Sequence, residues 1–483
     1  MTAKKEEKYN AIEKIIDSKS IKSFREESAF RVLVEESHFF YGATAIIKYR
    51  EGMFEVTVIC DNMPNQSIFD DFTSVYKNRV IQFSKSGITY EINSKDIREV
   101  TQTLTDPYIV KFLVDKFYEP DVSENLYYRL TIPLKEKPNF SPFETRKILI
   151  SGSMYFGLIK INLEGLDFEI FHFENKDLKE FYLTIDCLDR TLASVFEESV
   201  KTILKSYSLF TGNLYQAELY FTRNEKIEDW WKGRLYRFDN QSNNILSNLP
   251  IIHPREFRNF LKHYKREELA KNIGIRVNES KLAVICKNTH KNFKIERIIN
   301  LILEGNISKS LILRCSTYSV ALETLSNIIC DSKHQQNRPI QDEKLAELIN
   351  EKFKAIIEDY DFALSNNQKE ILEKKIDNFN KPLNTDKLKL AFELMRIKLN
   401  RNDLKALKAR NVFLHGSTPF KKFESNEKNK IGFSLFSNKM HLLLICLLLK
   451  YLGFTGAITN HYAFGKFNLD EEVDEHYFRI LQP

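Results

Sequence analysis

The sequence predicts an α+β protein in which an antiparallel, β-rich N-terminal domain is followed by an all-α C-terminal domain. Between about residues 28 and 187, short segments alternate apolar and polar residues and are separated by Gly, Pro, Asn and Asp, a pattern typical of antiparallel strands. From about residue 281 onward, apolar residues recur at helical spacing. A chain of 483 residues is long for one core, so we expect two or three domains.

The composition is that of a soluble globular protein, with 43% hydrophobic and 29% charged residues. The net charge of +6 permits an anionic partner without indicating one. The N-terminus is too charged for a signal peptide, and the run Leu442 to Leu449 is too short to span a bilayer. We therefore expect a cytoplasmic protein with no membrane segment. The six cysteines form no CxxC pair and have no His cluster beside them, which predicts free thiols, no bound metal and no cofactor.

The pattern divides the chain into four segments. Residues 1–27 are dense in Lys and Glu and predict a short surface helix or a tail. Residues 28–252 predict the β-rich domain, as a sandwich or an open barrel. Residues 253–280 predict a charged helical connector, and residues 281–483 predict the helical domain.

Within the β-rich domain, alternation predicts strands at residues 53–60, 87–92, 127–134, 154–163 and 167–173. A helix is expected from about Leu188 to Leu209, stopped near Gly212, with strands following at 215–223 and 234–238.

In the helical domain we expect helices at residues 311–330, 345–360, 387–400, 404–415 and 440–452, followed by a docked tail. The helix over 311–330 gathers its polar residues in one sector. This sector is either a solvated face or one wall of a polar cleft; it contains Ser316, Ser319, Glu323, Ser326 and Asn327.

The stretch LKALKARNVFLHGSTP, residues 404–419, combines an apolar stripe with polar groups. On a helix, Leu404, Leu407 and Leu414 form the stripe, and Asn411 falls inside it. Arg410 and His415 flank the stripe, roughly 70° to either side. Gly416 ends the helix and Pro419 prevents it from restarting. The pattern indicates a functional site, an interface, or both.

The spacing of Arg and His is weak evidence by itself, because two other pairs occur in the chain. Arg258 and His263 lie among further Lys and Arg residues with no Gly after the His, which favours a solvated basic helix. Arg31 and His38 lie where the first strands begin, which favours a structural role. The context therefore favours Arg410 and His415.

An Arg-Asn-x-x-x-His-Gly sequence late in an all-helical domain resembles the HEPN superfamily of ribonucleases. The segments YSVALETLSNII and KARNVFLHGSTP are similar to those of the ApeA-like proteins of bacterial phage defence, and the β-rich part is similar in architecture. The resemblance implies a HEPN helical bundle and an active site of Arg410, Asn411 and His415. It also implies an acidic residue from an upstream helix, for which Glu323 is the candidate.

The resemblance implies a metal-independent endoribonuclease, and the residue types allow that chemistry. His415 would transfer protons near neutral pH, and Arg410 would bind phosphoryl oxygens. Attack by the ribose 2′-OH would leave a 2′,3′-cyclic phosphate and a 5′-OH. Since one helix offers a single His, with its Arg about 140° away, we expect a homodimer with a composite site.

Lysines near the motif would hold the RNA backbone without reading its sequence: Lys405, Lys408, Lys421 and Lys422. The substrate would be tRNA or mRNA, and a phage-derived trigger would act through the N-terminal sensing domain. The alternative is a non-catalytic HEPN-type module for dimerisation or nucleic-acid binding. Asn411 beside an intact Arg and His favours the enzyme.

Overall fold

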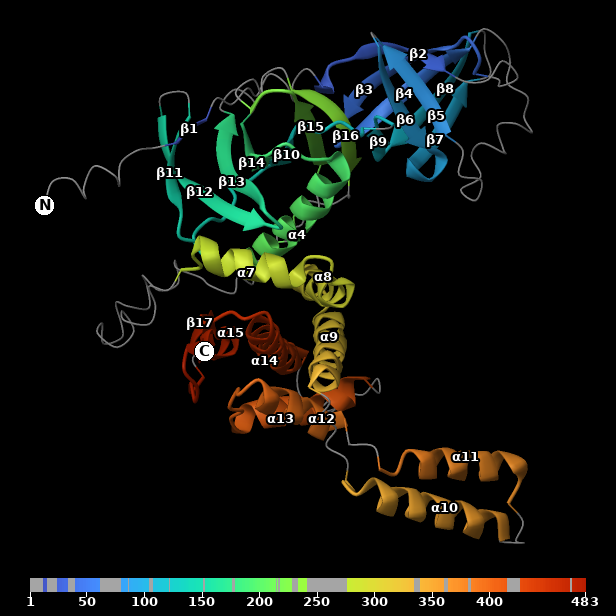
Figure 1. Cartoon of the computed structure of the whole chain (residues 1–483), viewed down its shortest axis with the longest axis vertical. Coiled ribbons are helices and arrows are strands. Elements are labelled where there is room, and N and C mark those ends of the chain that lie inside the picture. Colours follow the sequence, from blue (N-terminus) through green and yellow to red (C-terminus); the bar gives the residue numbers. More distant parts are fainter. Residues whose placement is uncertain are drawn as a thin grey trace, which may run out of the picture. The chain divides into compact units, whose positions relative to one another are not determined.

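A computed structural model of the chain forms two compact units, Met1–Lys291 and Asn292–Pro483. The α+β prediction is confirmed, because the first unit is built on an antiparallel sheet and the second on helices (Figure 1). The structure describes residues 12–14, 24–33, 40–60, 80–85, 87–103, 107–120, 122–150, 153–175, 179–213, 215, 218–227, 233–240, 276–333, 339–359, 364–380, 384–414, 426–469 and 471–483.

Sixteen strands of the described residues hydrogen-bond into one continuous sheet in the first unit, in the order β1-β11-β12-β13-β14-β10-β15-β16-β9-β6-β5-β2-β3-β4-β8-β7. The strands are β1 (Ile12–Lys14), β2 (Ser28–Leu33), β3 (Thr44–Arg50), β4 (Met53–Cys60), β5 (Val80–Lys85), β6 (Ile88–Asn93), β7 (Ile97–Thr103), β8 (Tyr108–Val114), β9 (Lys116–Tyr118), β10 (Tyr127–Leu134), β11 (Arg146–Ile150), β12 (Ser153–Leu163), β13 (Leu166–Asn175), β14 (Glu180–Cys187), β15 (Glu218–Asn224) and β16 (Arg234–Asn240).

The strands predicted from alternation are all present, with ends shifted by at most a few residues. In β4 every second residue is buried, from Phe54 to Cys60, as the period of two requires. In β10 both faces are largely covered, and seven of its eight residues are buried. When both faces of a strand are buried, apolar and polar residues no longer alternate clearly. Such a strand is then recognised by its length and its β-branched residues.

The sheet curls until strands far apart in its order touch. Four strands separate β4 from β9, yet the Phe54 ring lies 5.0 Å from that of Phe117, centroid to centroid. The Phe54 ring is also 4.7 Å from that of Phe238 on β16. These aromatic side chains lie inside the curl, so this part of the sheet is an open barrel, one of the two arrangements expected.

Helix α4 (Ala193–Thr211) covers part of the sheet (Figure 1). Its Phe196 ring stacks on Tyr128 of β10 with centroids 5.4 Å apart. Gly212 ends it with a left-handed backbone, φ 71°, which glycine adopts without steric cost. The predicted helix and its stop are confirmed, although α4 starts later than Leu188.

Two sequence expectations for the first unit need correction. Residues Ile12–Lys14, expected in a helix or tail, form β1, which pairs in parallel with β11. Helix α7 (Glu279–Thr289), expected in the helical domain, belongs to the first unit, where Glu279 forms an ion pair with Arg146 at 2.5 Å. The sequence of a short amphipathic helix predicts a buried face, but it does not show which domain that face packs against. Most of the expected connector, 253–280, lies outside the described residues.

The second unit is a helical assembly with one small sheet. Its strands β17 (Gly456–Thr459) and β18 (Phe478–Leu481) pair antiparallel, so the expectation of an all-α domain is wrong at its C-terminal end. The helices are α8 (Phe293–Ile307), α9 (Leu311–Ser332), α10 (Glu343–Asp359), α11 (Asn366–Asp377), α12 (Asn384–Leu394), α13 (Arg401–Leu414), α14 (Asn426–Tyr451) and α15 (His461–Asn468).

Helix α14 forms the centre of this unit and packs along α9. By length and composition alone, its segment Lys430–Tyr451 could cross a membrane. In the structure, however, Leu442 to Leu449 are all buried inside the unit. The apolar run is therefore a core helix, as the sequence predicted. All six cysteines are buried and free of disulfides, as expected.

The buried His172 on β13 makes the stability of the first unit depend on pH. Burial, with a smaller contribution from Lys137, lowers the pKa of His172 to about 4. In the unfolded chain the pKa is about 6.5, so the unfolded state takes up a proton first as the pH falls. We expect the free energy of unfolding to fall by about 2 kcal/mol from pH 6.5 to 5 on account of this residue. Urea titrations at both pH values should show a smaller fall in His172→Asn; an equal fall in both proteins would contradict the assignment.

Candidate active site

The predicted motif lies at the end of α13, and the start of that helix is capped by its own residues. The Asn400 side chain accepts a hydrogen bond from the Asp403 backbone at 2.8 Å. In return, the Asp403 carboxylate accepts one from the Asn400 backbone at 2.9 Å. This reciprocal arrangement is a capping box, which satisfies donors that the helix itself leaves free.

Asp403 also joins α13 to two later segments through buried charges. Its carboxylate, 0% exposed, lies 2.6 Å from the Lys439 ammonium of α14 and 2.7 Å from the Arg479 guanidinium of β18. Lys439 also pairs with Glu475 of the C-terminal tail at 2.5 Å. The expected docking of the tail is thus confirmed, and four charged groups fix the start of α13.

The apolar stripe of this helix does not have the role expected from the sequence. Leu407 is 0% exposed within its own chain and Leu404 is half-buried, whereas the sequence pattern allowed the stripe to form an interface. Among the α13 side chains that the structure describes, residues 401–410, the buried ones are Asp403, Ala406, Leu407 and Arg410. A charged residue can be buried in the core when the same chain supplies its ion-pair partners. The helical wheel used for the prediction placed the buried face on the Leu residues alone and was therefore wrong about its position. The side chain of Leu414 lies outside the described residues.

Arg410, with 0% of its side chain exposed, reaches from α13 to α9. Its Nε donates a hydrogen bond to the Ser319 carbonyl at 3.3 Å, and its Nη2 forms an ion pair with the Glu323 carboxylate. The Arg predicted from the motif and the acidic residue predicted on the upstream helix therefore touch. The structure brings together two of the four residues expected in the catalytic set.

The electrostatics of this pair are asymmetric. Burial lowers the pKa of the Arg410 guanidinium, and the charge and hydrogen bond of Glu323 oppose that effect. The Glu323 side chain is 38% exposed, so the pair has one buried end and one end facing solvent. In this conformation the guanidinium is enclosed, and a solvent-borne group would meet Glu323 first.

The polar sector of α9 is partly buried beside this pair. Ser319 and Ser326 are buried, and each hydroxyl donates to the carbonyl four residues earlier, at 2.7 and 2.8 Å. A solvated face is therefore wrong for these two serines. These two positions belong to the core, while Ser316, Glu323 and Asn327 of the same sector are half-buried.

The other predicted site residues divide into two groups. Lys405 and Lys408 are exposed on α13, one turn apart and away from the buried face. Asn411 is in α13, but its side chain lies outside the described part of the chain. The same holds for the whole of His415, Lys421 and Lys422, and for His38, Arg258 and His263 of the two other pairs. Among the described residues, no three His, Cys, Asp or Glu side chains are grouped so that they could hold a metal ion.

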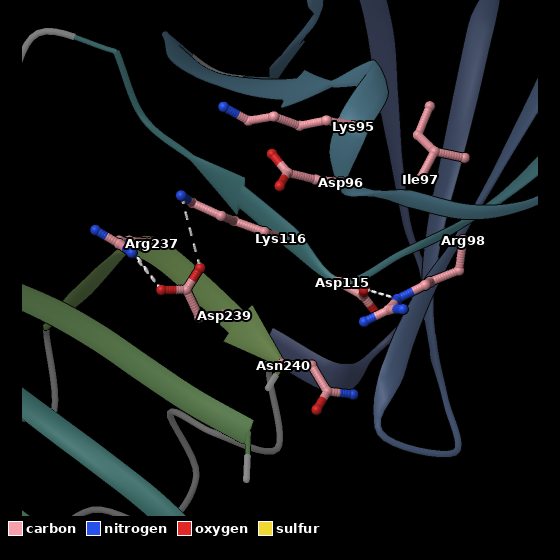
Figure 2. A pocket seen from close by; sticks show the side chains of 9 residues that line it. All are labelled: Lys95, Asp96, Ile97, Arg98, Asp115, Lys116, Arg237, Asp239 and Asn240. Carbon is pink, nitrogen blue, oxygen red and sulfur yellow. Dashed lines mark hydrogen bonds and ion pairs between the residues drawn. The ribbon is translucent and has the colours of Figure 1, made fainter. Parts of the chain in front are cut away.

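A polar cavity of about 630 Å³ lies in the first unit, between β7, β9 and β16 (Figure 2). Its charges largely neutralise one another. Arg98 pairs with Asp115, and Arg237 with Asp239, while the Lys116 ammonium lies 4.0 Å from the same Asp239. Arg237 also pairs with Glu197 of α4, so most of the charged groups in this lining belong to an ion-pair network that joins neighbouring elements.

Comparisons of the chain with family models, with curated proteins and with solved structures found no match.

The Glu323–Arg410 pair predicts a measurable coupling between α9 and α13. Glu323→Gln should lower the free energy of unfolding by about 1–3 kcal/mol, because it leaves a buried guanidinium without its counter-charge. Arg410→Met removes that charge, so adding Glu323→Gln to Arg410→Met should cost far less than Glu323→Gln alone.

A double-mutant cycle by urea denaturation measures this coupling. Glu393→Gln, a change at an exposed glutamate of α12, is the matched control and should have little effect. Additive effects of Glu323→Gln and Arg410→Met would show that the contact contributes nothing to stability.

Proposed function

We propose that the chain is a metal-independent endoribonuclease of bacterial anti-phage defence, of the abortive-infection type, that acts in the cytoplasm. The observation that supports this proposal is the ion pair between Glu323 and Arg410. These residues are 87 positions apart in the chain, and the resemblance to HEPN ribonucleases assigns both to one site. In the sequence, Arg410 precedes His415, the residue suited to proton transfer, by five positions.

In the proposed reaction the ribose 2′-OH attacks the neighbouring phosphorus and the bond from phosphorus to the 5′-oxygen breaks. The His415 of one chain, in its neutral form, accepts the proton of the 2′-OH. The His415 of the other chain, in its protonated form, donates a proton to the leaving 5′-oxygen. Arg410 stabilises the charge on the phosphoryl oxygens, and Asn411 supplies an amide beside them. The products are a 2′,3′-cyclic phosphate and a 5′-OH.

The burial of Arg410 gives this proposal a gating step. For the guanidinium to reach a phosphoryl oxygen, α13 must shift against α9 so that Arg410 becomes exposed, with Glu323 still beside it to orient it. Glu323 is partly exposed, so it already lies at the solvent end of the pair. In this proposal a phage-derived trigger, acting through the N-terminal unit, favours the open state and raises the cleavage rate above a basal level.

The proposed substrate is an RNA, either tRNA or mRNA, and the proposed active unit is a homodimer. Lys405 and Lys408, exposed on α13, would bind the RNA backbone together with Lys421 and Lys422. The dimer rests on the number of catalytic groups: one motif offers one His, and the reaction uses two proton transfers. The apolar stripe no longer supports it, since Leu407 is buried inside one chain.

The burial of Arg410 also favours a second candidate function, a non-catalytic HEPN-type module for dimerisation or nucleic-acid binding. In that case Arg410 and Glu323 would only hold α13 on α9. The two candidates differ in one property, because only the nuclease loses an activity when His415 is replaced in a folded protein.

Replacement of His415 should abolish RNA cleavage without unfolding the protein. We expect His415→Ala to lower the cleavage rate by about 10²–10⁴-fold, the usual contribution of acid–base catalysis, with an unchanged circular dichroism spectrum. His263→Ala, in the pair expected on a solvated basic helix, is the matched control and should cleave normally. Equal cleavage by wild type and His415→Ala would leave the binding module as the better account.

Cleavage should not require a divalent metal ion, because the ribose and the motif side chains supply every group used. Excess EDTA should leave the rate unchanged, and the 3′ ends should resist ligation until the cyclic phosphate is removed. Loss of cleavage in EDTA, with 5′-phosphate products, would contradict the mechanism.

The composite site predicts that two inactive chains complement each other. A mixture of His415→Ala and Arg410→Met chains should regain part of the cleavage that neither chain has alone, because a heterodimer holds one Arg410 and one His415, enough for one of the two proton transfers, at a shared site. Sedimentation of the wild-type protein measures its oligomeric state under the same conditions. An active monomer would show that each chain contains a complete site.

A further inference from the structure

The first unit contains an apolar cavity of about 480 Å³ inside the curled part of its sheet. Seven strands that are consecutive in the sheet contribute to its lining: β4, β3, β2, β5, β6, β9 and β16. The open end of a curled sheet is a common place for a small ligand, and this volume is typical of ligand sites.

Aromatic side chains are prominent in the lining of the cavity, at five of its thirteen residues. The buried Phe54 and Phe117 lie deep in it, and Tyr90 and Phe30 line it further out. These rings form a continuous chain, with centroid distances of 5.0 Å for Phe54 to Phe117, 5.2 Å for Phe117 to Tyr90 and 6.1 Å for Tyr90 to Phe30. Such a surface favours a flat aromatic group, which can pack edge-on or stacked against it.

The lining also holds a cation that is available to a ligand. The Lys85 ammonium lies 5.7 Å from the Phe30 ring centre and donates to the Ser28 hydroxyl at 3.2 Å. Lys85 is exposed, and among the described residues no carboxylate forms an ion pair with it. By contrast, Arg234, the second cation of the lining, pairs with Glu119.

We infer that this cavity is a binding site for a small ligand with a planar aromatic body and an anionic group, the anionic group meeting Lys85. The aromatic body would pack against the wall that Phe54, Phe117 and Tyr90 form. The exposed Glu26 also lines the cavity, so its charge opposes an anion there. The ligand class follows from this lining and is independent of the ribonuclease proposal.

Two dyes of the same shape test the inference on the full chain. 1-Anilinonaphthalene-8-sulfonate carries an aromatic body and a negative charge, and N-phenyl-1-naphthylamine is its uncharged counterpart. Fluorescence titration should show saturable binding of the sulfonate to one site. Lys85→Gln should weaken sulfonate binding about fivefold, as expected for one exposed charge pair, and should leave binding of the uncharged dye unchanged. Glu26→Gln should strengthen sulfonate binding.

Two further variants locate the dye. Ile88→Trp adds a large ring at a half-buried position of the lining and should abolish binding of both dyes. Lys48→Gln, a change on β3 away from the cavity, is the matched control and should bind as the wild type does.

If Ile88→Trp does not fold, the Lys85, Glu26 and Lys48 variants still test the inference. These side chains are exposed, so replacing them should not prevent folding. Sulfonate binding that is absent, or that does not respond to Lys85→Gln, would overturn the inference.

Discussion

The second unit depends on keeping two buried charges of α13 paired. Asp403 and Arg410 are both 0% exposed, and an unpaired charge at either position would cost several kcal/mol. Asp403 obtains its partners from α14 and β18, and Arg410 obtains its partner from α9. The rotation of α13 about its own axis is therefore set by charge pairing at both ends, with Leu407 packed between them.

This rotation determines what the helix presents to solvent. With Asp403, Leu407 and Arg410 turned inward, Lys405 and Lys408 point outward. A proposed active site at the end of such a helix is held by groups far away in sequence, from Ser319 to Arg479.

Much of the first unit could be predicted from the sequence, because a strand with one buried face shows its period directly. The strands around Phe54 and the stop at Gly212 are examples. The curl that brings Phe54 onto Phe117 could not be predicted, since it depends on the order of strands in the sheet. The aromatic cavity was missed for the same reason, because its lining comes from seven strands.

In the second unit, the positions of the helices could be predicted from the sequence. Which face of each helix is buried could be predicted only in part. The buried face of α13 was predicted from its Leu residues. The helix also buries charged residues, whose ion-pair partners come from other parts of the same chain. Asp403 and Arg410 look like surface residues in sequence, and only the placement of Lys439, Arg479 and Glu323 makes them internal. The proximity of Glu323 to Arg410 was suggested by the resemblance, while the role of Asp403 had no signal in the sequence beyond its place at the start of the helix.

The central claim is that the contact between Glu323 and Arg410 belongs to an RNA-cleaving site. The most direct test is the RNA cleavage rate of purified Glu323→Gln, compared with wild type and Glu393→Gln at a temperature where all three are folded. The account predicts a loss of about 100-fold for Glu323→Gln and none for Glu393→Gln. A folded Glu323→Gln protein that cleaves RNA at the wild-type rate would contradict it.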